Sequence, residues 1–235
     1  MTFRKTLHAE FIRRSLGRGF CSGVVNVMLM AFCGCTPSPV TSNVDWRDAI
    51  RDEVTLCCGD GSEVWTELDE FTYEQHGRIY EVDGTLILEA GEPGTGIRWA
   101  AFDIAKEDYE VRLMAKRIEG SDIFCALTLP HQHSYFTWVI GGWGGQVTGI
   151  SNIDGEPAAE NSSANVVEFE QGRWYALRIR VTSDRIVGWI DDQRVFDESV
   201  LDRSLNVWWE QEPARPLGIT TWNTSAAIRE VRYSR

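Results

Sequence analysis

The side chains best suited to acid–base chemistry gather between residues 120 and 161 of the 235-residue chain. Asp122 follows Gly120 and Ser121 at the start of an apolar run. Neighbouring apolar groups there would raise the pKa of its carboxyl, as a catalytic base requires. The same position also suits a turn residue whose carboxylate caps backbone amides, so Asp122 has both a catalytic and a structural interpretation.

Two histidines, His131 and His133, follow Pro130 and flank Gln132. In an extended chain both would project to the same side, where His131 could act as a base or the pair could bind a metal ion. A zinc site needs at least three protein ligands, and no third ligand occurs at a recognisable spacing. The sequence therefore indicates no metal site and no cofactor, although a divalent metal stays possible. A solvent-exposed loop is the competing interpretation of both histidines.

A second group of polar candidates lies on the loop after the segment GGWGGQVTGIS. Asp154 and Glu160 could supply acid–base groups, and Asn152 and Asn161 could hydrogen-bond a ligand, because loops on a rigid scaffold often carry function. The alternative is turn chemistry, since Asn-Ile-Asp-Gly at 152–155 favours a tight turn in any β protein.

Trp143 stands between two pairs of glycines in the sequence GGWGG, residues 141–145. Such a cluster marks a bulge, a sharp bend or a closely approaching partner, because glycine weakens a strand interior. At a sheet edge the glycines would let a ligand approach the backbone while the Trp143 indole stacks on a sugar ring. Alternatively, Trp143 plugs the end of a sandwich at a bulge. Trp222, next to Asn223 and Thr224, is a second candidate for stacking.

The elements that must position these residues have an all-β pattern. From about residue 60, short apolar runs separated by Gly, Asp and Asn recur without helical periodicity. Segments 109–118 and 174–181 alternate between apolar and polar residues, as half-buried antiparallel strands do. Arg178, on the polar face of the second segment, could hold a ligand oxygen, although an ion-paired surface is the alternative.

Further segments complete a two-sheet architecture. Segments 122–129 and 135–140 are apolar on both faces, which predicts central strands that are covered on both sides or line a groove. A hairpin is expected at 185–196, and other strands at 85–89, 97–102, near 208, 217–222 and 226–233. The pattern therefore predicts an all-β fold, a two-sheet antiparallel jelly-roll sandwich.

The first 35 residues have the features of an export signal. A basic lead precedes the apolar stretch VVNVMLMAFCGC, which is too short to span a bilayer, and TPSPVTSN follows it. This pattern resembles a bacterial lipoprotein signal. We therefore expect a signal peptide at 1–34, lipidation of Cys35, a flexible tether at 35–60 and a folded domain at 61–235. The predicted location is the cell envelope or periplasm.

The charge of the chain limits its partners. The formal net charge is −12, and the predicted signal peptide has five basic residues against one acidic residue, so its removal leaves −16. An acidic protein repels phosphates, which disfavours nucleic acids and anionic lipid headgroups. Neutral ligands such as carbohydrates are not disfavoured, and membrane attachment is expected only through the lipid anchor.

Six segments taken together resemble the 3-keto-disaccharide hydrolase domain family over residues 61–235. They are GSDIFCALTLP, VIGGWGGQVTGISNIDG, the triplet AEN at 159–161, GRWYALRIRV, RIVGWIDDQRV and PLGITTWNTSAAIREVRY. This family is similar in fold to concanavalin A-like lectins and glucanases, which implies a sandwich with one concave sheet. The AEN match makes Glu160 and Asn161 the stronger candidates within their loop.

The resemblance also implies action on sugars oxidised at carbon 3. A ketone there acidifies the hydrogen on carbon 2, so a base can form an enolate that expels the glycosidic oxygen, and water then adds back. Such a reaction needs a base, donors for the oxyanion and an acid for the leaving group. Direct hydrolysis by two carboxylates is the competing mechanism.

Two other functions are compatible with the same sequence, because sandwiches of this shape host both lectins and hydrolases. One is a noncatalytic, lectin-like carbohydrate-binding module that uses the same groove. The other is a laminin-G-like domain that binds another protein.

Overall fold

The computed structural model describes residues 53–56, 65–68, 75–101 and 103–235, which lie within one compact unit. The predicted signal peptide and Cys35 lie outside the described residues, as does most of the predicted tether. Residues 53–55, near the end of that tether, form strand β1 (Glu53–Thr55), which pairs with the last strand, β15 (Thr224–Ser234).

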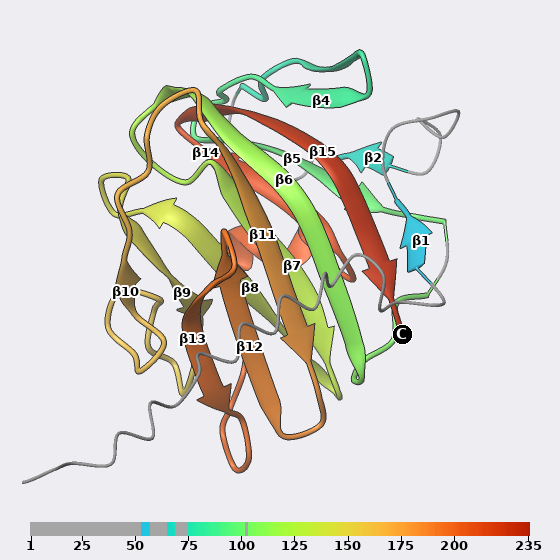
Figure 1. Ribbon diagram of the computed structural model, residues 1–235, viewed down its shortest axis with the longest axis vertical. Coiled ribbons are helices and arrows are strands. Elements are labelled where there is room, and N and C mark those ends of the chain that lie inside the picture. Colours follow the sequence, from blue (N-terminus) through green and yellow to red (C-terminus); the bar gives the residue numbers. More distant parts are fainter. Residues whose placement is uncertain (1–52, 57–64, 69–74, 102) are drawn as a thin grey trace, which may run out of the picture. The chain divides into compact units, whose positions relative to one another are not determined.

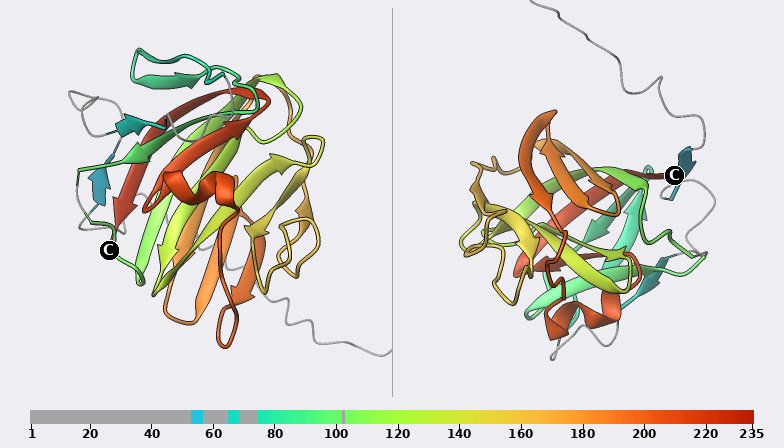
Figure 2. Two further views of the ribbon diagram at one scale, coloured as in Figure 1. Left: turned by 180° about the vertical axis from the view of Figure 1, so that it is seen from behind. Right: turned by 90° about the horizontal axis from the view of Figure 1, so that it is seen from below.

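Two antiparallel sheets make up the fold (Figures 1 and 2). The eight-stranded sheet has β1 beside β15 and otherwise follows the order β13 (Gln193–Ser199), β12 (Arg185–Ile190), β11 (Trp174–Val181), β6 (Tyr109–Gly120), β15, β4 (Thr85–Leu88) and β3 (Ile79–Val82). The seven-stranded sheet follows the order β10 (Asn165–Val166), β9 (Val147–Ser151), β8 (Ser134–Gly142), β7 (Cys125–His131), β14 (Gly218–Trp222), β5 (Gly94–Trp99) and β2 (Trp65–Glu67). The predicted two-sheet antiparallel sandwich is confirmed.

The core lies between the two sheets, where apolar side chains from alternate positions meet. In β11 and β6, Leu177 stands opposite Leu113 and Ile179 opposite Val111, and all four are at most 2% exposed. This is the alternation that the sequence predicts for both strands.

The central strands of the seven-stranded sheet differ in side-chain size between their two faces. The inner face carries large core residues of β7 and β8, such as Leu127, Phe136 and Trp138. The positions between them hold smaller side chains, including Ala126 and Thr137, which face outward. Because small outward side chains leave room above a sheet, a hollow can form on this outer face.

A short 3₁₀-helix, η4 (Trp209–Ala214), packs against β5 and β14 of the same sheet (Figure 2, left). The prediction of a strand near residue 208 is therefore wrong. Trp208 has an extended backbone and leads directly into η4, and Pro213 within η4 cannot donate a backbone hydrogen bond to a neighbouring strand. In the described part of the chain, no helix combines the length and the apolar composition needed to cross a membrane.

Candidate functional site

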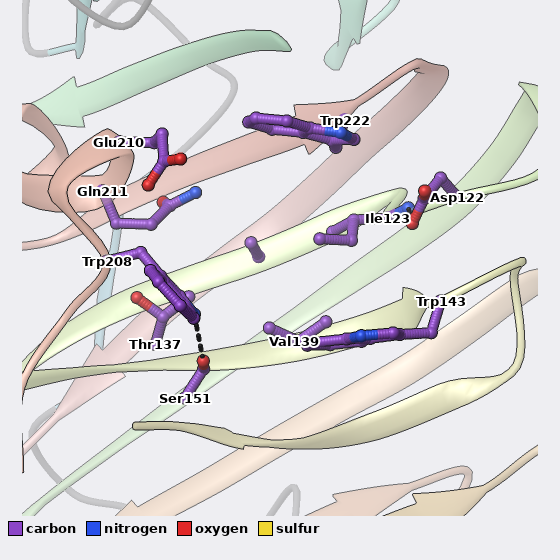
Figure 3. Close-up of a pocket in the computed structure, with 11 residues that line it drawn as sticks. Asp122, Ile123, Thr137, Val139, Trp143, Ser151, Trp208, Glu210, Gln211 and Trp222 are labelled. Atoms are coloured by element: carbon purple, nitrogen blue, oxygen red, sulfur yellow. Dashed lines mark hydrogen bonds between the residues drawn. The ribbon is translucent and has the colours of Figure 1, made fainter. Parts of the chain in front are cut away.

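A pocket of about 330 Å³ opens on the outer face of the seven-stranded sheet (Figure 3). Its floor is formed by small side chains of the central strands, Ala126, Thr137, Val139 and Ser151. Three tryptophans line its sides, Trp143, Trp208 and Trp222. Among the described residues, Asp122 and Ile123 of the β6–β7 connection and Glu210 and Gln211 of η4 also line it. The structure thus brings together three of the predicted site residues, Asp122, Trp143 and Trp222.

Trp143 and Trp222 form two facing walls of this pocket. Figure 3 shows both indoles edge-on, on opposite sides of the pocket, with their faces turned toward the space between them. Trp143 is 49% exposed, and Trp222 ends β14 and packs against Leu68 and Ala214. Two apolar ring faces across an open space suit a flat, amphipathic ligand.

The glycines around Trp143 serve the turn and its packing. The register between β8 and β9 shifts between Ile140 and Gly142, which is the bulge that the sequence offered as one interpretation. A Cβ added at Gly141 would stand 2.5 Å from Nη2 of Arg117, and one at Gly145 would stand 3.0 Å from the carbonyl oxygen of Ser121. These two glycines therefore make room for protein atoms, whereas Trp143 itself faces the pocket.

Asp122 lies at one end of the pocket, in the turn between β6 and β7. Its carboxylate accepts a hydrogen bond from the backbone N–H of Ile123 at 2.9 Å, and its own N–H donates to Oγ1 of Thr224 at 3.1 Å. Burial raises the pKa of the Asp122 carboxyl, while the N–H groups of Ile123 and Trp143 and the charge of Arg117 oppose this shift. Asp122 is therefore a turn residue whose carboxyl has a raised pKa, and its catalytic role stays a prediction.

Arg117 connects the backbone segments that form this end of the pocket. It is 6% exposed, and its Nη2 donates hydrogen bonds to the carbonyl oxygens of Gly145 at 2.9 Å, Asp122 at 3.2 Å and Gly141 at 3.4 Å. Burial lowers the pKa of the guanidinium. Arg117 is not among the site residues predicted from the sequence. The alternation that turns residues 111, 113 and 115 inward continues to residue 117, and this spacing could have identified Arg117 as an inward-facing residue.

Trp208 is a second pocket residue that sequence reasoning missed. Its Nε1 donates to Oγ of Ser151 at 2.9 Å, and that hydroxyl donates to Oδ1 of Asn152 at 2.7 Å. Asn152 in turn donates from Nδ2 to Oδ1 of Asn206 at 2.8 Å. Asn152, a predicted ligand-binding residue, therefore reaches the pocket indirectly, by orienting the hydroxyl that fixes the Trp208 indole.

The other candidates of the 152–161 loop lie outside the pocket. Asp154 accepts hydrogen bonds from the backbone N–H of Ser204 at 2.7 Å and from Nε of Arg203, so it fastens two loops together. Asn161 is 6% exposed and donates to the carbonyl oxygen of Ile150 at 2.7 Å. Glu160 is exposed. The structure gives Asp154 and Asn161 the turn chemistry that the sequence offered as the alternative.

His131 and Arg178 are also remote from the pocket. His131 ends β7, about 20 Å along the strand from Cys125 at the rise of an extended chain, and its Nε2 lies 3.2 Å from the carbonyl oxygen of Thr182. Arg178 lies on the outer face of the other sheet, where it pairs with Glu110 at 2.9 Å and stacks 4.3 Å from the ring centroid of Trp189. Arg178 thus has the ion-paired role that was its alternative interpretation.

Metal ligands do not gather in the described part of the chain, where no three His, Cys, Asp or Glu side chains are arranged as a metal ion would require. A second hollow, of about 620 Å³, contains none of the predicted site residues. It is lined by Arg98, Lys106 and Arg215 together with Asp103 and Glu212, and Arg215 already pairs with Glu212 at 2.7 Å. The tryptophan-lined pocket is therefore the candidate site.

Comparison with solved structures supports the architecture. The β-glucanase of Bacillus licheniformis is similar over 79% of this chain and 99% of its own, with a TM-score of 0.52 and 9% identity. The Crh5 transglycosylase in complex with NAG is similar over 79% of this chain and 85% of its own, with a TM-score of 0.52 and 11% identity. At these identities the likeness shows the fold alone, and it confirms the predicted concanavalin A-like sandwich.

Comparison of sequences identifies the family. None of the curated proteins matches the chain. A family match covers residues 59–234, nearly the whole segment for which the sequence motifs indicate a resemblance. The chain belongs to the family of 3-keto-alpha-glucoside-1,2-lyase-like domains, which is a carbohydrate-related family.

Proposed function

We propose that the protein binds a glycoside in the tryptophan-lined pocket and cleaves glycosides that carry a ketone at carbon 3. The observation that carries this proposal is the placement of Asp122 beside the facing indoles of Trp143 and Trp222. Indole faces favour the apolar face of a pyranose ring, and a carboxylate next to that ring is in reach of its hydrogens. Membership of the family supports a 3-keto-glycoside as the substrate.

Asp122 acts as the base in the proposed reaction. Its carboxylate removes the hydrogen on carbon 2, and the electrons of that bond form the enolate of the neighbouring ketone. The enolate then expels the glycosidic oxygen from carbon 1, and this oxygen takes up the proton that Asp122 holds. Water adds across the resulting double bond, with its hydroxyl on carbon 1 and its hydrogen on carbon 2. The raised pKa of Asp122 suits both the removal and the return of the proton.

A noncatalytic carbohydrate-binding module is the second candidate. The three tryptophans would suffice to hold a sugar ring without any chemistry, and binding alone does not need a carboxyl with a raised pKa. A binding module differs from the proposed enzyme in one testable respect: it binds the sugar saturably and releases no product.

The experiment that separates the two functions measures binding and turnover of a 3-keto-disaccharide with the same purified protein, with and without a divalent metal ion. Cleavage by the wild type and its loss in Asp122→Asn, with binding retained, is the expected result. Trp143→Ala should weaken binding, whereas Trp209→Ala should not, because Trp209 does not line the pocket. Binding without cleavage would establish the binding module, and absence of both would overturn the proposal.

We also propose that the protein is exported and held in the cell envelope by a lipid on Cys35. The support is the basic and apolar order of residues 1–35. Growth of producing cells with a labelled fatty acid should label the wild type and leave Cys35→Ser unlabelled. Equal labelling of both proteins would refute this location.

A further inference from the structure

The end of the pocket opposite Asp122 is formed by the first turn of η4, which places a carboxylate and an amide beside the tryptophans. Glu210, Gln211 and the indole of Trp208 lie together there, while Asp122 and Ile123 lie at the other end (Figure 3). We infer that Glu210 and Gln211 form a polar subsite that recognises hydroxyl groups of an uncharged sugar unit. This inference rests on the proposed binding of a sugar and adds the residues that select it.

Gln211 is held so that its amide nitrogen faces the pocket. The residue is 7% exposed, and its Oε1 accepts hydrogen bonds from the hydroxyls of Thr220 at 3.0 Å and Thr128 at 3.3 Å. The Thr128 hydroxyl also lies 3.0 Å from that of Thr137. The single proton of the Thr128 hydroxyl is donated to Gln211, so Thr137 must donate to Thr128. These hydrogen bonds hold Oε1 of Gln211 toward the sheet. The Nε2 group is then turned toward the space between the tryptophans (Figure 3).

Glu210 supplies an acceptor at the same end. Its Oε2 is buried and has no hydrogen-bond partner among the described residues, although the residue as a whole is partly exposed and lines the pocket. A buried carboxylate oxygen without a partner is unfavourable, and a ligand that donates a hydrogen bond to it would remove this penalty. Because Oε2 is buried, a ligand hydroxyl can bond to it only after the Glu210 side chain rotates toward the pocket, and this rotation would remove the penalty.

A neutral polyol fits this pair of groups better than a charged ligand does. A sugar hydroxyl can accept a hydrogen bond from the Gln211 amide while it, or its neighbour on the ring, donates one to Glu210. Among the described residues, the lining of the pocket contains Asp122 and Glu210 but no Lys or Arg, so these residues would repel an acidic or phosphorylated sugar. The indole of Trp208, fixed by Ser151, provides an apolar surface beside the same hydroxyls.

The test uses the full protein and, as probes, methyl α-D-glucopyranoside and its monodeoxy analogues. Affinities are measured by calorimetry for the wild type, Glu210→Gln and Gln211→Glu. The change at residue 211 keeps an oxygen for Thr128 and Thr220 and replaces the donor with a carboxylate oxygen, which also adds a negative charge beside Glu210. Near-ultraviolet circular dichroism checks that this variant keeps the fold. Glu212→Gln is the matched control, since it alters an exposed carboxylate of the same helix that pairs with Arg215 and does not line the pocket.

We expect both variants to bind methyl glucoside about tenfold more weakly, and Glu212→Gln to bind as the wild type does. At least one deoxy analogue should bind the wild type more weakly than methyl glucoside does. The same analogue should bind one of the two variants no more weakly than it binds the wild type, because the altered residue and the missing hydroxyl form a single interaction. Unchanged affinity in both variants would overturn this inference alone. Absence of any binding by the wild type would overturn it together with the sugar-binding proposal, whereas absence of cleavage would leave it standing.

Discussion

The buried guanidinium of Arg117 donates a hydrogen bond to the carbonyl oxygen of Asp122 over 3.2 Å, and the same Nη2 donates to the carbonyl oxygen of Gly145 over 2.9 Å. These two acceptors belong to different connections, one between β6 and β7 and the other between β8 and β9. Asp122 and Trp143 are therefore held in place by one side chain that does not itself line the pocket.

Replacement of Arg117 by Met should destabilise the protein and weaken ligand binding together. Carbonyl oxygens that lose a buried donor cost about 1–3 kcal/mol each, so we expect the free energy of unfolding to fall by roughly 3 kcal/mol. Urea denaturation measures this loss. Arg185→Met is the control, because Arg185 pairs with Asp197 at the surface, where an ion pair contributes about 1 kcal/mol or less. Equal losses in the two variants would contradict the role of Arg117.

Asp122 should make the folded protein less stable at neutral pH than an uncharged residue of the same shape. Burial raises the pKa of its carboxyl in the folded state, so the folded protein binds the proton more tightly than the unfolded chain does. The free energy of unfolding therefore falls as the pH rises from below the unfolded pKa, about 3.9 for Asp, to above the folded value.

We accordingly expect Asp122→Asn to be more stable than the wild type at about pH 7 and equal to it below about pH 3. Urea denaturation across this range provides the measurement. Cleavage of a 3-keto-glycoside by the wild type should decline on the acidic side of the raised pKa, since the base must be ionised. A variant that is less stable than the wild type at neutral pH would show that the carboxylate stabilises the fold.

Much of the fold is readable from the sequence because a strand with one buried face has to alternate. Residues 109–118 and 174–181 show this pattern, and they form β6 and β11. Trp208 and Trp209 predict a strand because tryptophan has a high β propensity, and two adjacent residues are too few to show a helical or strand periodicity. Their actual place depends on packing of η4 against β5 and β14, which are more than a hundred residues apart in the chain.

Site residues could be predicted from the sequence only where a reactive or aromatic side chain lies in a turn that the sequence itself marks. Asp122 and Trp143 could be named because apolar runs and glycines mark the turns that present them. Gln211 could not, because its role depends on hydroxyls of Thr128 and Thr220 that come from separate strands. Asn161 shows a different difficulty, since a buried Asn that donates hydrogen bonds to backbone carbonyls has the same sequence pattern as a ligand-binding Asn.

Removal of the Asn152 side chain should weaken ligand binding, although Asn152 does not line the pocket. The hydroxyl of Ser151 donates to Oδ1 of Asn152 and thereby keeps its lone pairs directed at Nε1 of Trp208. We expect Asn152→Ala to reduce affinity for methyl glucoside about fivefold, which corresponds to one net hydrogen bond of about 1 kcal/mol.

Ser151→Ala should have a similar effect, and the double variant should lose little more than either single one, because both act through the Trp208 indole. Calorimetric titration of the three proteins tests this. Asn165→Ala is the control, since the Asn165 side chain donates to the carbonyl oxygen of Val195 at the surface. Losses that simply add would mean that Asn152 and Ser151 act separately.

Two of the four glycines around Trp143, Gly141 and Gly144, should tolerate alanine unequally, although both have a positive φ, 80° at Gly141 and 86° at Gly144. Alanine at either position bears the cost of the left-handed backbone, about 1–2 kcal/mol. At Gly144 an added Cβ would meet no described atom within 4 Å, so this cost should be the whole effect.

At Gly141 the added Cβ would stand 2.5 Å from Nη2 of Arg117 and 2.8 Å from the ring of Phe124, which is fully buried. Overpacking of this kind costs a further 1–3 kcal/mol or so, and it would also displace the guanidinium that positions Asp122. We therefore expect Gly141→Ala to lower the urea midpoint clearly more than Gly144→Ala and to weaken sugar binding as well. Equal midpoints would mean that the glycines serve only the backbone of the turn, and that Arg117 can move without loss.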